Sequence, residues 1–373
     1  MSCFNKKTIT AVAALLFFIP FTVYALEPSE ISARSAVLID RTTGDILFSK
    51  NENRRMKPAS TTKILTGIIA LERCDENAVV TVSENAASAE GSSMYLKRGD
   101  KMKMGDLIYG LMLNSGNDAA VAISEYISGS EEKFATLMNQ KAKEIGAKNS
   151  NFVTPDGLDD ENHYTTAYDL AVIASYAMSN ERFRETVSTV GKVAETLDGV
   201  KKYMHNHNKL LKLYDGCNGI KTGFTKASGR TLVSSAEKDG MELIAVTLNA
   251  PDDWNDHRKM LDFGFENHEL MTFLKKGEIC ARFQVTGGTR EYVGVSPEKD
   301  ISLTVGKNGA DKYRVEFPDI KPVAPIKKGD PAGTAYILDE TGVILSAGLF
   351  AAEDIPRRKM SFREILMRFL CLV

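Results

Sequence analysis

Ser60-Thr61-Thr62-Lys63 follows Lys57-Pro58-Ala59 and opens the apolar run Ile64-Leu65-Thr66-Gly67-Ile68-Ile69-Ala70-Leu71. A serine and a lysine three residues apart near the start of a helix lie on the same face, one turn apart. A neutral lysine can then take the serine proton and leave a nucleophile. Free N–H groups at a helix N-terminus favour the negative charge that develops beside such a serine. The stretch therefore predicts a nucleophile, Ser60, with Lys63 as its base, although S-x-x-K alone also occurs by chance among surface residues.

Two later stretches strengthen this interpretation. Ser115-Gly116-Asn117 follows an apolar stretch over 107–113, and Lys221-Thr222-Gly223 precedes a strand-like stretch over 230–236. Each tripeptide is common on its own. The ordered set S-x-x-K, S-x-N and K-T-G, each in a fitting local context, is typical of serine acyltransferases that react with penicillin.

Composition bounds the class of protein. The chain has 373 residues, of which 43% are hydrophobic and 26% charged, and this is long enough for two domains. The net charge of −2 gives no indication of nucleic-acid binding. The five histidines form no H-E-x-x-H pattern, and there is no phosphate-binding loop. We therefore expect neither a metal nor another cofactor, and no nucleic-acid partner.

The first residues resemble a signal peptide. Lys6 and Lys7 precede an apolar segment over 11–23, and Val23-Tyr24-Ala25 is a plausible cleavage site. The prediction is a signal peptide over 1–25 and an exported protein; the alternative is an uncleaved membrane anchor. The four later cysteines show no metal-like spacing, so we expect free or buried thiols: Cys74, Cys217, Cys280 and Cys371.

The order of elements predicts an α+β catalytic domain over 26–275. A β-hairpin is expected over 35–50, a mainly helical region from 57 to about 180, and antiparallel strands over 231–237 and 243–249. A helical segment over 257–265 follows. The simplest assembly is one antiparallel sheet with helices on its faces and a helical subdomain.

The character of the chain changes after residue 275. Short β-type runs over 301–305, 312–317 and 333–338, separated by Gly, Pro and Asp, predict a small all-β domain over 276–355. The last segment, 356–373, is basic, and its apolar residues form one helical stripe: Phe362, Ile365, Leu366, Phe369, Leu370 and Val373. Such a segment suits an anchor at a membrane surface; the alternative is a helix that packs on the chain's own β domain.

Taken together, the sequence resembles the D-alanyl-D-alanine carboxypeptidase family of low-molecular-mass penicillin-binding proteins. The resemblance covers essentially the whole chain and includes the segments 151–158, 163–171, 219–225 and 324–329. It implies the penicillin-binding serine transferase fold followed by a β domain. It also implies removal of the terminal D-alanine from peptidoglycan stem peptides, covalent reaction with β-lactam antibiotics, and attachment to the outer face of a bacterial membrane.

The resemblance also implies roles for the matching residues. Ser60 is the nucleophile that becomes acylated, Lys63 is its general base, Ser115 relays a proton to the leaving amine, and Asn117 holds Lys63 and a substrate amide.

Other residues are expected to surround the substrate. Lys221 and Thr222 face its terminal carboxylate, with Arg258 as a further candidate for that contact. The backbone N–H groups of Ser60 and Phe224 form an oxyanion hole. The substrate-binding set is Lys221, Thr222, Gly223, Phe224, Arg258 and His163, of which His163 either shapes the edge of the site or has a structural role. Two positions depart from many relatives, Asn218 and His207.

Two other functions remain open at this level. A class A-like β-lactamase needs a glutamate that activates the deacylating water, and Glu161 is the one candidate. It lies in a segment that resembles the carboxypeptidases instead. The other alternative is a catalytically weak protein that binds the cell wall, against which the complete set of three motifs argues.

Overall fold

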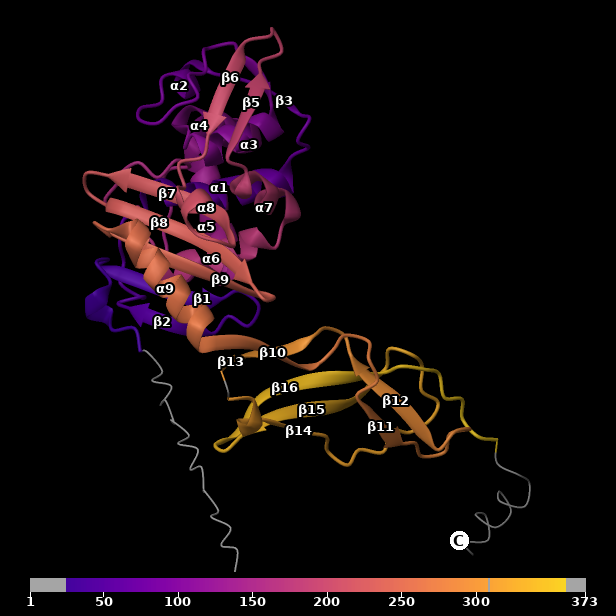
Figure 1. Ribbon diagram of the computed structural model, residues 1–373. Coiled ribbons are helices and arrows are strands. Elements are labelled where there is room, and N and C mark those ends of the chain that lie inside the picture. The colour runs from indigo at the N-terminus through magenta and orange to yellow at the C-terminus, as the bar shows by residue number, and fades with distance from the viewer. Residues whose placement is uncertain (1–24, 308, 360–373) are drawn as a thin grey trace, which may run out of the picture.

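The computed structural model describes residues 25–359 apart from residue 308. The predicted signal segment up to residue 24 and the tail from residue 360 lie outside the described residues. A body of helices packed on a sheet comes first along the chain, and a smaller body of strands follows it (Figure 1). Within the described part of the chain, no helix is long and apolar enough to span a bilayer.

The first body is built on a five-stranded antiparallel sheet, in the order β2-β1-β9-β8-β7. The predicted early hairpin and late strands are confirmed, because they meet in this one sheet. The edge strand β7, which carries Lys221, has no alternating apolar pattern and was not predicted. The strands are β1 (Ser35–Asp40), β2 (Ile46–Lys50), β7 (Cys217–Thr225), β8 (Gly229–Lys238) and β9 (Met241–Leu248).

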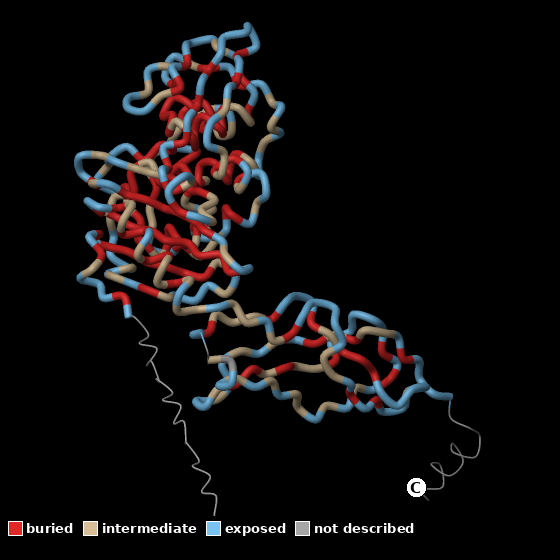
Figure 2. Tube along the Cα trace, viewed as in Figure 1, coloured by how far each residue is buried: buried red, intermediate tan, exposed pale blue. Residues whose placement is uncertain are grey.

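Alternate residues of the central strands enter two different cores, as the pleat of a strand requires. Val37 and Ile39 of β1 pack in the core on the helical side, whereas Ala36 and Leu38 pack beneath helix α9 (Asp253–Asn267). The central strands β1, β8 and β9 are therefore buried on both faces and are mainly red in Figure 2, whereas the edge strands β2 and β7 are only partly buried. The predicted helical segment over 257–265 is confirmed as part of α9.

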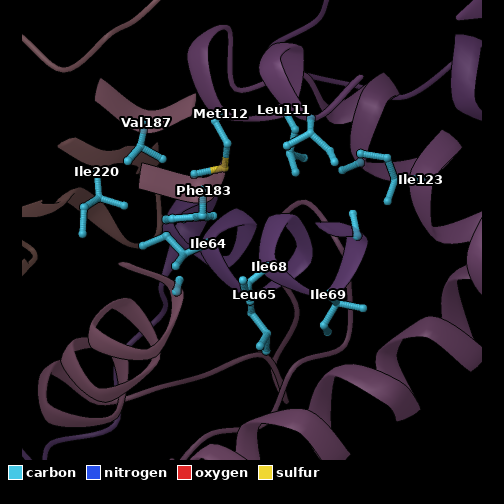
Figure 3. Close-up of a cluster of buried hydrophobic side chains, with 14 of the residues drawn as sticks. Ile64, Leu65, Ile68, Ile69, Leu111, Met112, Ile123, Phe183, Val187 and Ile220 are labelled. Carbon is cyan, nitrogen blue, oxygen red and sulfur yellow. The ribbon is translucent and has the colours of Figure 1, made fainter. Parts of the chain in front are cut away.

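Helix α1 (Lys63–Arg73) is the centre of the helical side. Its side chains Ile64, Leu65, Ile68 and Ile69 are surrounded by apolar residues from other helices and from β7 (Figure 3). Burying this helix on all sides fixes the segment just before it, where Ser60 lies. The other helices are α2 (Glu84–Ala87), α3 (Met104–Leu113), α4 (Asn117–Ser128), α5 (Glu131–Ile145), α6 (Ala167–Met178), α7 (Glu181–Ser188) and α8 (Leu210–Leu213).

Two short two-stranded ribbons accompany the region over 57–180 that was predicted to be mainly helical. One lies within this region and the other follows it along the chain. The first ribbon pairs β3 (Val79–Thr81) with β4 (Lys101–Lys103). The second, β5 (Gly191–Glu195) with β6 (Lys201–His205), rises beyond the helices (Figure 1). A 3-10 turn, η1 (Pro28–Glu30), precedes β1.

The second body is the predicted all-β domain, and its existence is confirmed. Its five-stranded sheet has the order β11-β12-β16-β15-β14. A separate two-stranded ribbon pairs β10 with β13. The first of these strands ends just before the predicted boundary at residue 275, and the second follows it. The elements are β10 (His268–Leu274), β11 (Ala281–Gln284), β12 (Tyr292–Pro297), β13 (Ile301–Gly306), η3 (Ala310–Lys312), β14 (Arg314–Glu316), β15 (Pro331–Asp339) and β16 (Gly342–Ala351).

Candidate active site

Ser60 lies in a 3-10 turn, η2 (Ala59–Thr62), and Lys63 is the first residue of α1. The two residues thus lie at the start of a helix, with Ser60 in the 3-10 turn that leads directly into α1. A 3-10 helix has three residues per turn, so residues three apart lie directly above one another. The Nζ atom of Lys63 is 2.9 Å from Oγ of Ser60. The tighter turn aligns the two side chains better than an α-helix would.

Lys63 is fully buried, and its amine has two further partners. Nζ donates to Oδ1 of Asn117 at 2.7 Å and to the carbonyl oxygen of Asp156 at 2.6 Å. Burial lowers the pKa of Lys63 to about 8, against the opposing charges of Asp156 and Asp118. About a tenth of the amine is therefore neutral at pH 7, and about half of it at pH 8.

The three partners of Lys63 decide how its neutral form is arranged. An amide oxygen and a backbone carbonyl can only accept hydrogen bonds, whereas a hydroxyl can also donate. A neutral amine has two hydrogens and one lone pair. It keeps its bonds to Asn117 and Asp156 and turns the lone pair to the hydroxyl of Ser60. Deprotonated Lys63 is thus held in the orientation that a base for Ser60 requires.

Asn117 is fixed from the other side by a loop. Its Nδ2 donates to the carbonyl of Glu90, and this contact settles which end of the amide faces Lys63. Gly91 has a φ of +92°, and a Cβ there would lie 2.8 Å from Nδ2 of Asn117. Ser115 is buried in the turn between α3 and α4, with a φ of +58°. The second motif therefore lies beside the first: Asn117 contacts Lys63, and Ser115 lines the same cleft as Ser60.

His163 supports the loop that carries Asp156. Its Nδ1 accepts from the N–H groups of Val153 at 3.1 Å and Thr154 at 3.2 Å, which places the proton on Nε2. Nε2 then donates to Oγ1 of Thr62 at 2.9 Å. Burial lowers the pKa of His163 to about 4. This neutral, buried histidine ties the loop to the turn η2 and does not line the cleft.

Strand β7 forms the wall opposite these residues. A Cβ on Gly223 would lie 3.0 Å from the backbone N of Ser60 and 2.4 Å from Oγ1 of Thr231, so only glycine permits this approach. Lys221 is buried, and its Nζ donates to the carbonyl of Thr222 at 2.9 Å. Burial, and then the charge of Lys63, hold the pKa of Lys221 well below its usual value. The third motif thus lies against the first.

A cleft of about 340 Å³ opens between these walls. Five predicted residues line it, and Lys63, Asn117 and Lys221 lie buried beside them. Trp254, Lys209 and Arg230 were not predicted; Arg230 is placed by its pairing with Phe224 across the β7–β8 turn. The lining residues are Ser60, Ser92, Ser115, His207, Lys209, Thr222, Gly223, Phe224, Arg230, Asp253 and Trp254.

The structure does not bring Arg258 into this cleft. The residue follows the fully buried His257 in α9 and is turned outward by the phase of the helix. Its guanidinium is exposed and donates to Oδ1 of Asn255 at 3.1 Å on its own helix. Within the described residues, no group of three His, Cys, Asp or Glu side chains is placed to hold a metal ion. The described cysteines, Cys74, Cys217 and Cys280, are free.

Two family profiles match most of the chain. Residues 22–252 match "D-alanyl-D-alanine carboxypeptidase", and residues 268–357 match "Penicillin-binding protein 5, C-terminal domain". The D-alanyl-D-alanine carboxypeptidase DacF of Bacillus subtilis is 37% identical over 348 residues, which cover 90% of this chain and 88% of that protein.

Solved structures show the same likeness. Penicillin binding protein 5 from Haemophilus influenzae is 30% identical, with a TM-score of 0.77, over 89% of this chain and 100% of that one. The Streptomyces K15 DD-transpeptidase is 32% identical, with a TM-score of 0.60, over 63% of this chain and 98% of that one. The predicted α+β fold with its appended β domain is confirmed.

Proposed function

The chain belongs to the D-alanyl-D-alanine carboxypeptidase family, and we propose that it removes the terminal D-alanine from peptidoglycan stem pentapeptides through an acyl-enzyme on Ser60. The observation that carries the assignment of Ser60 is the 2.9 Å contact between its hydroxyl and the buried amine of Lys63. No cofactor takes part in the proposed reaction, because the amine and hydroxyl supply its proton transfers.

In the first half-reaction, Oγ of Ser60 attacks the carbonyl carbon of the penultimate residue while its proton passes to Nζ of Lys63. The oxygen of the tetrahedral intermediate is stabilised by the backbone N–H groups of Ser60 and Phe224. The close approach of Gly223 to Ser60 supports this arrangement, because it sets β7 directly beside the nucleophile.

Collapse of the intermediate breaks the peptide bond, and the leaving amine needs a proton. Ser115 lines the cleft together with Ser60 and is proposed to relay that proton from Lys63. Water then attacks the acyl carbonyl, and Lys63 takes the proton of this water as it took that of Ser60. The bond between the acyl group and Oγ of Ser60 breaks, and Lys63 returns the proton to this oxygen. Asn117 keeps the amine in place during both steps through its 2.7 Å hydrogen bond.

The alternative of a class A-like β-lactamase finds no support at Glu161. This side chain is exposed and does not line the cleft, so it is not placed to activate a water beside Ser60. β-Lactam antibiotics are instead proposed to acylate Ser60 as substrate analogues.

We also propose that the protein is exported and acts at the outer face of the cytoplasmic membrane. The support is the signal-like segment over 1–25 and the basic, amphipathic tail over 356–373. Both places are consistent with a substrate in the cell wall.

The test is D-alanine release from a labelled pentapeptide stem by the purified protein. The wild type is expected to release D-alanine and the Ser60→Ala variant is not, while both unfold at the same temperature. Release by Ser60→Ala at the wild-type rate would remove Ser60 from the mechanism.

A further inference from the structure

A groove of about 670 Å³ lies where the two bodies of the molecule meet, and it shares no lining residue with the catalytic cleft. Its walls are residues 301–303 of β13 and 344–348 of β16, which run beside each other in Figure 1. The turn over 298–300 closes one end. The β1–β2 turn borders the other end, where Oγ1 of Thr43 lies 2.9 Å from Oγ1 of Thr304.

Both walls of this groove are strand edges. Successive side chains of a strand point to opposite faces, so consecutive residues can all line one cavity only along the edge of the strand. β13 pairs with β10 on the side away from the groove, and β12 pairs only with residues 349–351 of β16. Within the described residues, each wall therefore has an edge without a partner strand.

The backbone groups on the β16 side can be assigned from a neighbouring hydrogen bond. The N–H of Ala351 donates to the carbonyl of Asp330, at the start of β15, at 2.9 Å. Backbone N–H and C=O groups alternate between the two edges of an antiparallel strand. Ser346 and Ile344 therefore direct these groups to the open edge. Neither residue is charged, and Ile344 is 41% exposed.

The same reasoning applies to β13. Lys307, which follows this strand, donates to the carbonyl of Asn267, next to β10, at 2.9 Å. The alternation directs the backbone groups of Ser302 and Thr304 away from β10 and toward the groove. Two rows of backbone donors and acceptors thus face the groove, and an extended peptide can pair with such rows.

The open edge of β16 lacks the protection that proteins usually give to strand edges, which is charge, proline or shortness. The outer strands of the same sheet have it, because β11 carries the exposed Arg282 and the three-residue β14 carries Arg314 and Glu316. Residues 343–348 of β16 include neither a charged residue nor a proline. This contrast indicates an edge that pairs with a partner.

The side chains of the groove define the chemistry of that partner. Its middle is mainly apolar, with Ile301, Leu303, Ile344, Leu345 and Phe350. Its ends carry three acidic residues and one lysine: Asp45, Glu298, Asp300 and Lys299. A segment that combines apolar residues with lysine or arginine is complementary to both parts.

We propose that this groove binds an extended segment of another protein, which adds as a strand to the open edge of β16. Backbone hydrogen bonds supply the affinity, and apolar and basic side chains of the segment supply the selectivity. About five residues, or roughly 17 Å of strand, span the edge over 344–348. The first body contributes Thr42, Thr43 and Asp45 to the lining, so the bound segment contacts both bodies. The inference does not depend on the reaction at Ser60.

The experiment uses a phage-displayed library of random seven-residue peptides, selected on the purified full-length protein. The selected peptides should alternate apolar residues and contain lysine or arginine. A fluorescein-labelled copy gives the Kd by fluorescence anisotropy. Copies that are N-methylated at alternate residues, in either phase, lack the donors for one edge. At least one of them should bind about tenfold more weakly, as expected for two lost neutral hydrogen bonds.

Two variants test the edge itself. Ser346→Pro removes one N–H from the open edge and leaves the ladder with β15 intact, so it should weaken binding by about 2- to 12-fold, the range for one neutral hydrogen bond. Ile344→Lys adds a positive charge to the exposed edge and should also weaken binding of the basic peptide. This second variant decides the question if the proline variant does not fold.

Gln284→Pro is the matched control. Val285 donates to the carbonyl of Glu291 at 2.7 Å, on the β12 side, so the N–H of Gln284 faces the outer edge of β11, away from the groove. The control should keep the wild-type Kd, with unfolding temperatures measured for every variant. A library that yields no enriched peptide, or a wild-type Kd for both Ser346→Pro and Ile344→Lys, would overturn the proposal.

Two other occupants are distinguished by further measurements. Deletion of residues 360–373 should leave the Kd of the peptide unchanged, and tighter binding after the deletion would identify the chain's own tail as the occupant. Analytical ultracentrifugation should show the same oligomeric state for the wild type and Ser346→Pro. Loss of a dimer in Ser346→Pro would identify a second copy of the chain as the occupant. Either result would overturn the assignment to another protein.

Discussion

Lys63 donates a 2.7 Å hydrogen bond to Oδ1 of Asn117, and this contact joins the start of α1 to the start of α4. The two residues are 54 positions apart along the chain. The bond therefore depends on the whole helical core. Its partner atom can only accept, which leaves Ser60 as the donor to a neutral Lys63.

The first prediction concerns pH. Only neutral Lys63 can accept the proton of Ser60, and burial places its pKa at about 8. The rate of penicillin acylation should therefore rise with pH, by about tenfold per unit below pH 8, and level off above it. Acylation rates measured between pH 6 and 9.5 check this. A rate that fell as the pH rose through 8 would contradict a neutral lysine base.

The second prediction separates a structural from a catalytic role for His163. His163→Ala leaves the N–H groups of Val153 and Thr154 without an acceptor. The two donors are part-buried, and a fully buried donor left unpaired costs about 1–3 kcal/mol, which is the upper range for each of them. The unfolding temperature should drop, while the midpoint of the pH–acylation profile stays in place, because the pKa of His163 is already about 4.

The exposed His205 provides the control for this variant. His205→Ala should change neither the unfolding temperature nor the profile, since the side chain is exposed on β6. A shift in the midpoint with His163→Ala at an unchanged unfolding temperature would instead assign His163 a part in proton transfer.

The third prediction concerns the approach of β7 to the nucleophile. A methyl group added by Gly223→Ala would meet Oγ1 of Thr231 at 2.4 Å and the backbone N of Ser60 at 3.0 Å. The strand must move, and a displacement of about 1 Å can cost about 10²-fold in rate. We expect a loss of this size in acylation, measured with labelled penicillin. Gly348→Ala is the control, because its Cβ would meet nothing nearer than 3.6 Å. Normal acylation by Gly223→Ala would show that β7 takes no part.

The fourth prediction concerns the tail, whose predicted range begins at residue 356. Thr289 donates to the carbonyl of Pro356, and Arg358 donates to that of Gly287, each at 2.9 Å, so these residues belong to the β domain. The sharper deletion is therefore 360–373. It should release the protein from membranes and leave D-alanine release from soluble peptides intact.

A pair of point variants makes the same test without a deletion. Phe369→Asp places a charge on the apolar stripe and should weaken membrane binding, whereas Met367→Asp places the same charge off the stripe. Sedimentation with membranes measures both. Continued sedimentation of the truncated protein would place the anchor elsewhere.

The sequence predicted the parts of the fold that depend on local pattern. The hairpin over 35–50 and the strands over 231–237 and 243–249 contain short apolar runs bounded by turn signals, and all were found in the sheet. Strand β7 was missed because Gly219, Lys221 and Gly223 interrupt any apolar run; the strand is placed by contact with η2 and β8 rather than by its own propensity.

The site residues also divide into those that the sequence predicted and those that it did not. The residues of the three motifs were predicted because their types and order carry the chemistry, and the structure brings Ser60, Lys63, Ser115, Asn117 and Lys221 together. For a residue outside the motifs, the direction of the side chain depends on its position around the helix or along the strand that carries it.

Arg230 and Arg258 illustrate that dependence. α9 turns Arg258 to solvent, while the register of β8 brings Arg230 to the cleft. A charged residue at the edge of a turn gives no local signal of either outcome.

The most direct test of the central claim is the site of covalent attachment of penicillin. The protein is incubated with labelled benzylpenicillin, digested, and the modified peptide is sequenced by mass spectrometry. The account predicts one adduct, on Oγ of Ser60, and no labelling of a folded Ser60→Ala variant. An adduct on another residue, or undiminished labelling of Ser60→Ala, would contradict it.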